Sequence, residues 1–296
     1  MSAHVLVGRQ RELGELATAL ADAEAGRGAL VLIRGEPGIG KSRLASAFVE
    51  SAVGARVAWG RAWEAGGAPA YWPWIEAFRA LWQQAPADER DGLPKSRLAE
   101  LVQMDGELAA HTGDLGTPPQ LEPQQARFRL FDAASAVIAH FAARSPLVIV
   151  LDDLHAADPA SVEMLQFVAR TVRTTRAVIV ATYRDSEARS RAEVADAIAR
   201  LSRDGRTIAL SRLAETAVSE WVAQEGRPEL AHAVYARSEG NPLFVVELLR
   251  LAEELGDRGL SEIPDSVRDV IRQRLGTLPP VTREVLQTAA VLGRVV

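Results

Sequence analysis

A phosphate-binding loop is the clearest chemical signal in this chain of 296 residues. The stretch GEPGIGKS, residues 35–42, fits the pattern G-x-x-x-x-G-K-[ST], with Gly35, Gly40, Lys41 and Ser42 in the required positions. Glycines let backbone N–H groups approach phosphate oxygens, and the helix that follows aims its positive end at the anion. Lysine offers a compact charge for the β- and γ-phosphates, and the serine hydroxyl can bind Mg²⁺. The alternative is a plain glycine-rich turn between a strand and a helix.

A pair of aspartates follows a second apolar run. In PLVIVLDDLHAAD, five apolar residues lead directly into Asp152 and Asp153. A buried strand that delivers a carboxylate to a metal would have this form, so we predict that Asp152 binds Mg²⁺ together with Ser42. Asp153 would orient or polarise the water that attacks a phosphate. The alternative role for such aspartates is helix capping, which suits Asp158 before a proline better than Asp152, whose buried carboxylate needs a cation.

A third apolar run, AVIVATYR, ends in Thr182 and Arg184. If it is a strand parallel to the others, Arg184 lies at the same edge of the sheet as the phosphates and could sense the γ-phosphate. The alternative is a solvated arginine where the strand ends. Three further arginines, at positions 170, 173 and 176, could include an arginine finger for a neighbouring subunit, although an exposed helix face also explains them.

The elements that must position these residues alternate between strands and helices. Apolar runs predict strands near residues 29–34, 55–60, 147–152, 177–183 and 206–211. Alternation of this kind favours an α/β fold with a parallel sheet covered by helices on both faces. Ligands of such sheets bind beyond the carboxyl ends of the strands, where Lys41, Asp152 and Arg184 should converge.

A long insert, residues 61–145, separates the second predicted strand from the third. It begins with AYWPWIEAFRALWQQ, in which Trp74, Phe78 and Trp82 recur every four residues, and ends with a long amphipathic helix in EPQQARFRLFDAASAVIAHFAA. The aromatic stripe is interpreted as core, with a docking face for another domain or partner as the alternative. After about residue 212 the pattern predicts helices only. Because the chain stops inside another helical pattern, we expect a fragment of a longer protein.

Composition excludes several classes of function. The formal net charge is −5, which argues against DNA binding by this chain alone. The sequence has no cysteine, so disulfides, thiolate metal sites and cysteine nucleophiles are excluded. Neither a signal peptide nor a membrane-spanning run is predicted, and we expect a cytoplasmic protein without a membrane partner. Lys41 and Lys95 are the only lysines, and one of them lies in the glycine-rich stretch.

The motifs occur in an order that resembles a known family. LVGRQREL, GEPGIGKSRL, LDDLHAAD, ATYR and GNPLFVVELL follow one another across nearly the whole chain. This order, together with YWPWIEAFR, resembles the STAND branch of AAA+-related P-loop ATPases, and in particular the N-terminal module of large ATP-binding LuxR-family transcriptional regulators. The resemblance implies a three-layer P-loop NTPase domain at 1–212, a helical lid at 213–262 and the start of a winged-helix-like element at 263–296.

The resemblance also implies site residues. The segment Val7, Gly8 and Arg9 would lie against adenine, and the motif that contains Pro242 would close a lid over the nucleotide. Cofactors would be ATP or ADP with Mg²⁺, and Lys41, Asp152, Asp153 and Arg184 would be catalytic. The loop residues expected to contact the nucleotide are Gly35, Glu36, Pro37, Gly38, Ile39, Gly40, Lys41, Ser42 and Arg43.

The family implies a slow regulatory switch in which ATP replaces ADP and the protein self-associates. Its partners would be C-terminal sensor and DNA-binding domains of a full-length regulator. One departure is that Ala156 and Ala157 follow His155, where the family commonly has a tryptophan. Asp153 is another, because many AAA+ motors carry glutamate there, and a shorter carboxylate suits slow turnover. Two alternatives remain: a nucleotide-binding scaffold without hydrolysis, and an AAA+ loader or remodelling ATPase acting on DNA.

Overall fold

The chain forms two compact units. The computed structural model describes residues 6–63, 67–107, 112, 115, 121–190, 192–255, 275 and 279–292. The large unit contains Arg11–Gly35 and Lys41–Ala209, and the small unit contains Met1–Gln10, Glu36–Gly40 and Leu210–Val296. The tip of the glycine-rich loop therefore packs with the small unit, whereas the residues that flank it belong to the large unit.

A parallel sheet of five strands in the order β2-β3-β4-β1-β5 forms the centre of the large unit. The strands are β1 Ala29–Arg34, β2 Arg56–Arg61, β3 Leu147–Asp152, β4 Ala177–Tyr183 and β5 Arg206–Ala209. Their positions confirm the predicted α/β fold class. In the register of the sheet, Arg61 lies beside Asp152, and Ile33 lies beside Thr182. The chemistry-bearing residues thus end up on adjacent strands at one edge.

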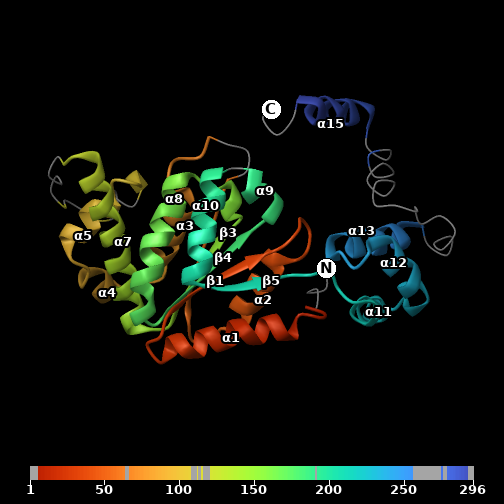
Figure 1. The fold of residues 1–296 in the computed structure, drawn as a ribbon, viewed down its shortest axis with the longest axis horizontal. Helices are drawn as coiled ribbons and strands as arrows, with labels where there is room; N and C mark the ends of the chain where they lie inside the picture. Colours follow the sequence, from red (N-terminus) through yellow and green to blue (C-terminus); the bar gives the residue numbers. More distant parts are fainter. Residues whose placement is uncertain are drawn as a thin grey trace. The chain divides into compact units, whose positions relative to one another are not determined.

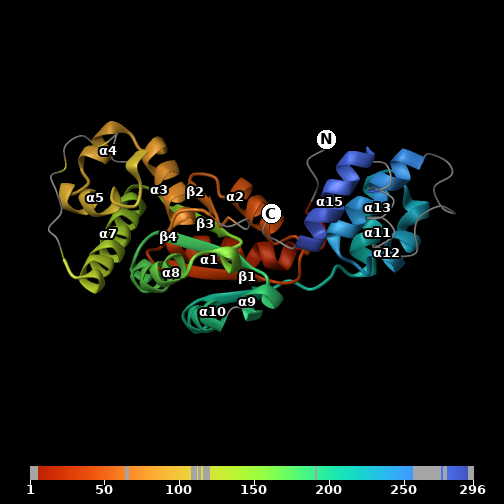
Figure 2. The same cartoon turned by 90° about the horizontal axis from the view of Figure 1, so that it is seen from above.

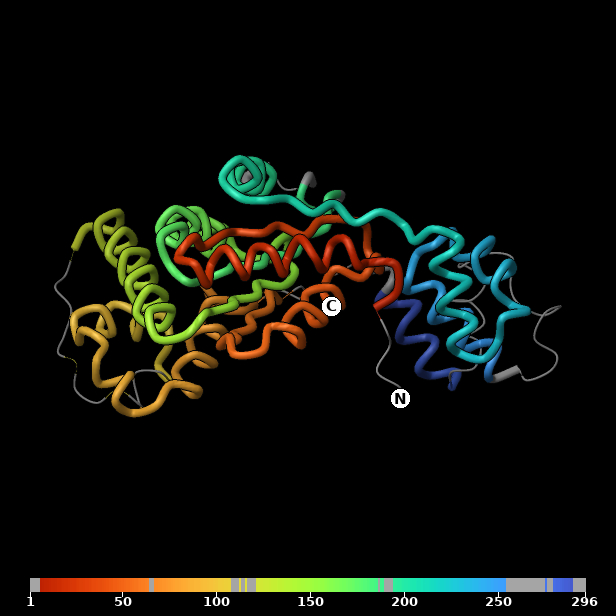
Figure 3. Tube along the Cα trace, turned by 90° about the horizontal axis from the view of Figure 1, so that it is seen from below, coloured from red at the N-terminus to blue at the C-terminus, as the bar shows by residue number. Residues whose placement is uncertain are grey.

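The inner strands β1, β3 and β4 are apolar on both faces because helices cover both faces. Every residue of β3 and of β4 is buried. One core cluster takes Leu30, Ile149 and Ile179 from the strands together with helix side chains such as Trp74 and Leu165. Figures 1 and 3 show α1 running along one side of the strands. The helices of this unit are α1 Gln10–Glu24, α2 Lys41–Ser51, α3 Trp72–Gln84, α4 Ala87–Asp91, α5 Lys95–Leu101, α7 Pro123–Arg144, α8 Pro159–Thr171, α9 Asp185–Ser190 and α10 Ala192–Asp204.

The insert builds helices α3, α4, α5 and α7, and the last three lie together to the left in Figures 1 and 2. Helix α3 packs on β2 and β3. Its aromatic stripe belongs to the core, as predicted, because Trp74 is 0% exposed, Phe78 is 4% exposed and their ring centroids lie 5.9 Å apart. Trp82 is half-buried and packs against the same cluster. The interpretation as a docking face loses most of its support.

The small unit is helical, as predicted for the chain after residue 212. Helices α11 Glu215–Gln224, α12 Ala231–Ser238 and α13 Pro242–Leu255 lie together in Figure 2, and α15 spans Pro280–Leu292. Their core includes Val7, Val218, Trp221 and Leu248. Most of the predicted winged-helix-like element, residues 263–274, 276–278 and 293–296, lies outside the described residues. Among the helices that are described, none has the length and apolarity needed to cross a membrane.

Candidate functional site

Asp152, the last residue of β3, is fully buried and its carboxylate is bonded on both oxygens. Its Oδ1 accepts hydrogen bonds from Ser42 Oγ at 2.9 Å and from Thr182 Oγ1 at 2.6 Å. Its Oδ2 accepts from two guanidinium nitrogens of Arg61, at 3.1 Å and 2.7 Å. Such donors offset the cost of burying a charged group away from water. The structure therefore brings the predicted pair of Ser42 and Asp152 into direct contact.

Lys41 is the first residue of α2 and is only 6% exposed. Its Nζ donates to the carbonyl oxygen of Gly35 at 3.1 Å. The pKa of Lys41 is lowered from its ordinary value, first by burial and then by the positive charge of Arg184, while Asp153 and Asp152 act in the opposite direction. An anion bound beside the ammonium would offset both of the lowering effects. The lysine is thus placed to stabilise negative charge at the start of the helix.

Within the small unit, the loop tip turns at two glycines with positive φ, Gly38 at 76° and Gly40 at 97°. A Cβ on Gly38 would lie 2.7 Å from Leu243 Cβ and 3.0 Å from Asn241 Oδ1, so only glycine fits there. The backbone N–H of Leu243 donates to the carbonyl oxygen of Gly38 at 3.2 Å. The start of α13 consequently packs directly on the loop tip.

The side chain of Asn241 connects the loop tip to the start of α13 within the small unit. Its Oδ1 accepts from the backbone N–H of Leu243 at 3.0 Å, which is the N-cap interaction typical of an asparagine before a proline at the first helical position. Its Nδ2 donates to Glu36 Oε1 at 3.0 Å and to the carbonyl oxygen of Pro37 at 3.1 Å. Arg212 also donates to Glu36 Oε1, at 2.9 Å. Glu36 therefore links the loop tip to residues that lie more than 170 positions later.

The predicted adenine segment packs within the small unit. Arg9 is 4% exposed, and its guanidinium donates to the carbonyl oxygens of Ile39 at 3.3 Å and Ser211 at 2.6 Å. Gly8 has φ of 67°, and a Cβ there would lie 2.8 Å from Ala217 Cβ. These contacts explain the residue types by packing alone. A contact of Val7, Gly8 or Arg9 with adenine stays a prediction.

Asp153 adopts a left-handed conformation, with φ of 59° and ψ of 41°. Its backbone N–H donates to Thr182 Oγ1 at 3.0 Å, so the threonine touches both aspartates. Arg184 forms an ion pair with Glu187 at 2.9 Å. Glu187 also lies 3.0 Å from Nε2 of the buried His155, so one carboxylate contacts both the arginine and the histidine. The predicted γ-phosphate sensor is thus held beside the strand end by a carboxylate.

Some predicted residues lie away from this edge. Arg43 points to Glu50 and forms an ion pair with it at 3.1 Å. Arg170 and Arg173 are exposed and precede the first residue of β4, so they lie toward the opposite edge of the sheet, and Arg173 pairs with Asp204 at 3.1 Å. Their exposure fits the interpretation as a solvent-facing surface. Asp158 caps α8 by accepting from the N–H of Ser161 at 3.0 Å, as predicted.

Arg61 is the residue of this edge that the sequence analysis missed. In the sequence it stands at the start of the long insert, whereas in the structure it ends β2 beside Asp152 in the register of the sheet. A charged residue at the end of an apolar strand was the available signal. Recognising it required knowing that β2 is the neighbour of β3.

The oxygen donors at this edge fit Mg²⁺. The hydroxyl of Ser42 and the carboxylate of Asp152 are hard ligands held next to each other, and Mg²⁺ is usually bound by one or two such protein groups with waters and phosphate oxygens completing its shell. The lysine at the start of α2 lies in the same loop. These residues together could hold a metal-bound polyphosphate.

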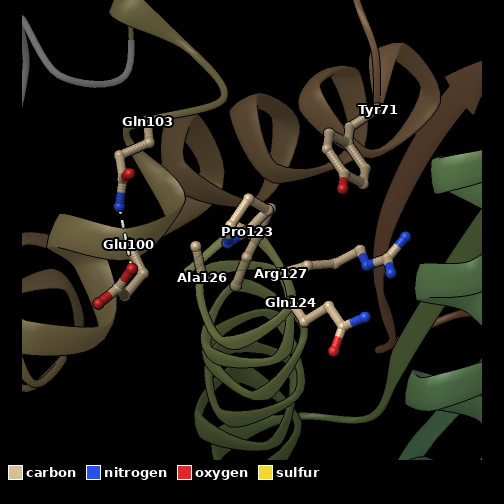
Figure 4. Close-up of a pocket in the computed structure, with 8 residues that line it drawn as sticks. Tyr71, Glu100, Gln103, Pro123, Gln124, Ala126 and Arg127 are labelled. Carbon is tan, nitrogen blue, oxygen red and sulfur yellow. Dashed lines mark hydrogen bonds between the residues drawn. The ribbon is translucent and has the colours of Figure 1, made fainter. Parts of the chain in front are cut away.

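A separate hollow of about 420 Å³ lies in the insert, as Figure 4 shows. Gln103 donates to Glu100 at 2.9 Å on one side of it, and the start of α7 contributes Gln124 and Arg127 on the other. Tyr71, which precedes α3 with φ of 65°, completes the lining in the figure. None of the residues that line this hollow belongs to the predicted site.

Comparisons with known proteins agree with the fold. A family model described as AAA ATPase domain matches residues 5–181. The Aeropyrum pernix ORC2 protein in its ADP form is similar in structure, with a TM-score of 0.55, 15% identity and coverage of 92% of this chain and 69% of that chain. A Signal Transduction ATPase with Numerous Domains from Pyrococcus horikoshii gives a TM-score of 0.51 and 16% identity, covering 93% of this chain and 33% of that chain. No sequence among the curated proteins matches.

Proposed function

The chain belongs to the AAA ATPase domain family, and from that premise we propose that it is a nucleotide-operated switch that binds ATP or ADP with Mg²⁺ and hydrolyses ATP slowly. The observation that carries the proposal is the contact between Ser42 and Asp152, whose oxygens lie 2.9 Å apart. These residues come from the start of α2 and the end of β3, and 110 positions separate them in the sequence. A hydroxyl and a carboxylate brought together from such distant positions supply two hard oxygen ligands suitable for Mg²⁺.

The residues would divide the work as follows. The Lys41 ammonium would pair with phosphate oxygens, whose negative charge would offset the lowering of its pKa by burial. Backbone N–H groups of the loop would donate to the same phosphates. Ser42 and Asp152 would hold Mg²⁺, whose charge stabilises the negative charge that develops during phosphoryl transfer. Arg184 would exchange Glu187 for the γ-phosphate.

Asp153 is the proposed group that orients the attacking water. Its left-handed backbone and its N–H bond to Thr182 hold the residue at the strand end. Its carboxylate is short, and the Asp153–His155 separation of 3.9 Å places a histidine nearby. A carboxylate with a short reach suits slow hydrolysis, below about one turnover per second, rather than the faster turnover typical of kinases.

The proposal also extends to the full-length protein. We place the chain in a larger LuxR-type regulator, with a nucleotide-binding domain at 1–212, a helical lid at 213–262 and a winged-helix-like element from 263. The support is the order of motifs along the sequence. The Pyrococcus horikoshii protein is described as having a tetratricopeptide repeat sensor, but at 16% identity the likeness is one of fold.

The nucleotide that co-purifies with the chain tests the proposal most directly. We expect ADP or ATP on release by denaturation and chromatography, and a single-turnover assay should show Mg²⁺-dependent cleavage. Binding without cleavage would favour a scaffold. Micromolar binding to duplex DNA with a steep dependence on salt would favour a loader acting on DNA. Failure to bind any nucleotide would end the proposal.

A further inference from the structure

Arg61 forms an ion pair with Asp152, the carboxylate that is proposed to bind the metal. Its Nε and Nη2 both donate to Asp152 Oδ2, at 3.1 Å and 2.7 Å. The other oxygen of Asp152 accepts the two hydroxyls of Ser42 and Thr182. The carboxylate is thus fully bonded by the protein's own groups, and a divalent cation that approaches Asp152 has to compete with a guanidinium for its charge.

The two partners of this ion pair differ in their access to water. The Arg61 side chain is 60% exposed, whereas that of Asp152 is 0% exposed. An exposed guanidinium can leave the pair and be hydrated at little cost, but a buried carboxylate left alone would be strongly disfavoured. The arginine can therefore leave only when another cation replaces it on Asp152.

A second carboxylate lies beside the arginine. The backbone N–H of Arg61 donates to Glu76 Oε2 at 2.7 Å. The pKa of Arg61 is raised, first by its hydrogen bond to Asp152, against a lowering effect of burial, and the negative charges of Asp153 and Glu76 also raise it. Glu76 thus holds the backbone of Arg61 and adds negative charge near its guanidinium.

Helix α3 fixes Glu76 at this position. A Cβ on Gly60, the residue before Arg61, would lie 1.8 Å from the carbonyl oxygen of Pro73. Only glycine permits this close approach of β2 to the first turn of α3. The first turn of α3 is therefore packed against the end of β2, where Arg61 lies between Glu76 and Asp152.

We propose that Arg61 is the counter-cation of Asp152 in the metal-free protein, and that Mg²⁺ arriving with the nucleotide displaces it toward Glu76. The inference rests on the proposed function, since it assumes a metal at Ser42 and Asp152. As a consequence, Arg61 competes with the metal for Asp152 and raises the concentration of divalent metal needed to half-saturate the site; this concentration is the threshold. Glu76 lowers that threshold because it draws the arginine away.

Two variants should shift the threshold in opposite directions. Binding of Mn²⁺ in the presence of saturating ADP is measured by electron paramagnetic resonance, which counts the free ion. For Arg61→Gln, the half-saturating Mn²⁺ concentration should fall about tenfold, as expected for loss of one charge-assisted competitor. For Glu76→Gln, which keeps an oxygen for the N–H of Arg61, it should rise about threefold. Arg144→Gln, which breaks an exposed pair with Asp88, is the control and should change nothing.

A second readout needs no nucleotide. Without metal, Arg61→Gln should melt at a lower temperature than the wild type, because Asp152 loses its only bonded cation among the described residues. Arg61→Lys, which keeps the charge but loses the two-pronged bond, should fall between the two in both measurements. It serves as the test if Arg61→Gln does not fold.

Several results would overturn the inference. Equal or weaker Mn²⁺ binding in Arg61→Gln would mean that the arginine supports the metal-bound state. If Arg61→Gln binds ADP tenfold more weakly than the wild type in the absence of metal, Arg61 contacts phosphate instead. If the wild type binds no Mn²⁺ with ADP, the proposed function itself fails. If the wild type binds and all variants behave alike, only the inference fails.

Discussion

Thr182 donates its hydroxyl hydrogen to Asp152 at 2.6 Å and accepts the backbone N–H of the following aspartate at 3.0 Å. The threonine is fully buried at the end of β4. One side chain thus holds both acidic residues of the neighbouring strand end. The arrangement depends on the parallel pairing of β3 with β4.

Replacing this threonine tests how much its hydroxyl contributes. Thr182→Val keeps the shape but leaves a buried oxygen of Asp152 and the backbone N–H of Asp153 with one partner fewer, so we expect a loss of about 1–3 kcal/mol in the free energy of unfolding. Urea denaturation measures it. Thr182→Ser should lose less than about 1 kcal/mol because the hydroxyl remains. A valine variant as stable as the wild type would contradict this account.

Lysine substitution tests the phosphate site. Lys41→Ala should weaken ADP binding by about tenfold to a hundredfold, because a charged donor to phosphate is lost. Isothermal titration calorimetry measures the affinity. The chain offers a matched control, since Lys95 is the only other lysine and is exposed at the start of α5. If Lys95→Ala and Lys41→Ala reduce binding equally, the loop is not the phosphate site.

The two adjacent aspartates should separate binding from hydrolysis. Asp153→Asn should keep ADP affinity within about threefold, since asparagine tolerates the left-handed backbone, and should slow single-turnover cleavage by about a hundredfold or more. Asp152→Asn should instead remove the effect of Mg²⁺ on nucleotide affinity. Rapid-quench measurements and calorimetry distinguish the two. Normal cleavage by Asp153→Asn would assign the water-orienting role to another group.

The link between the loop tip and α13 can be tested by exchanging an amide and a carboxylate. Asn241→Asp keeps the cap on Leu243 but places a negative charge against Glu36, so the small unit should be destabilised by about 1–3 kcal/mol. Adding Glu36→Gln should restore part of that loss, because the glutamine can donate to the new aspartate. Hydrogen exchange at residues 36–40 and 241–245 is the measurement. Additive effects of the two changes would show that the side chains do not interact.

The close approach of β2 and α3 predicts a steric effect. Gly60→Ala would place a methyl group 1.8 Å from the carbonyl oxygen of Pro73, so one element must shift, at a cost of about 1–3 kcal/mol. Gly14→Ala is the control: it lies in α1 with no atom within 4 Å of the added Cβ and should be stabilising by about 0.5–1 kcal/mol. Thermal melting compares the two. A neutral Gly60→Ala would show that α3 is not held against the strand.

The sequence alone determined the local elements and the most distinctive chemical groups. The sequence pattern predicted all five strands of the sheet to within two residues at each end. The runs at β1, β3 and β4 were the clearest, because a strand buried on both faces must be apolar throughout. The spacing of Trp74 and Phe78 predicted a buried helix face. The loop from Gly35 to Ser42 could be recognised because its backbone chemistry requires particular residue types at fixed positions.

Only the tertiary structure decided which distant groups Arg61 and Asn241 contact. That Arg61 bonds Asp152 follows from β2 being the neighbour of β3, and strand order is set by how helices and twisted strands pack rather than by any local pattern. Asn241 and Glu36 meet across 205 positions for the same reason. Local periodicity records which face of an element is buried, but a contact between two elements depends on their mutual placement, which no short stretch of sequence contains.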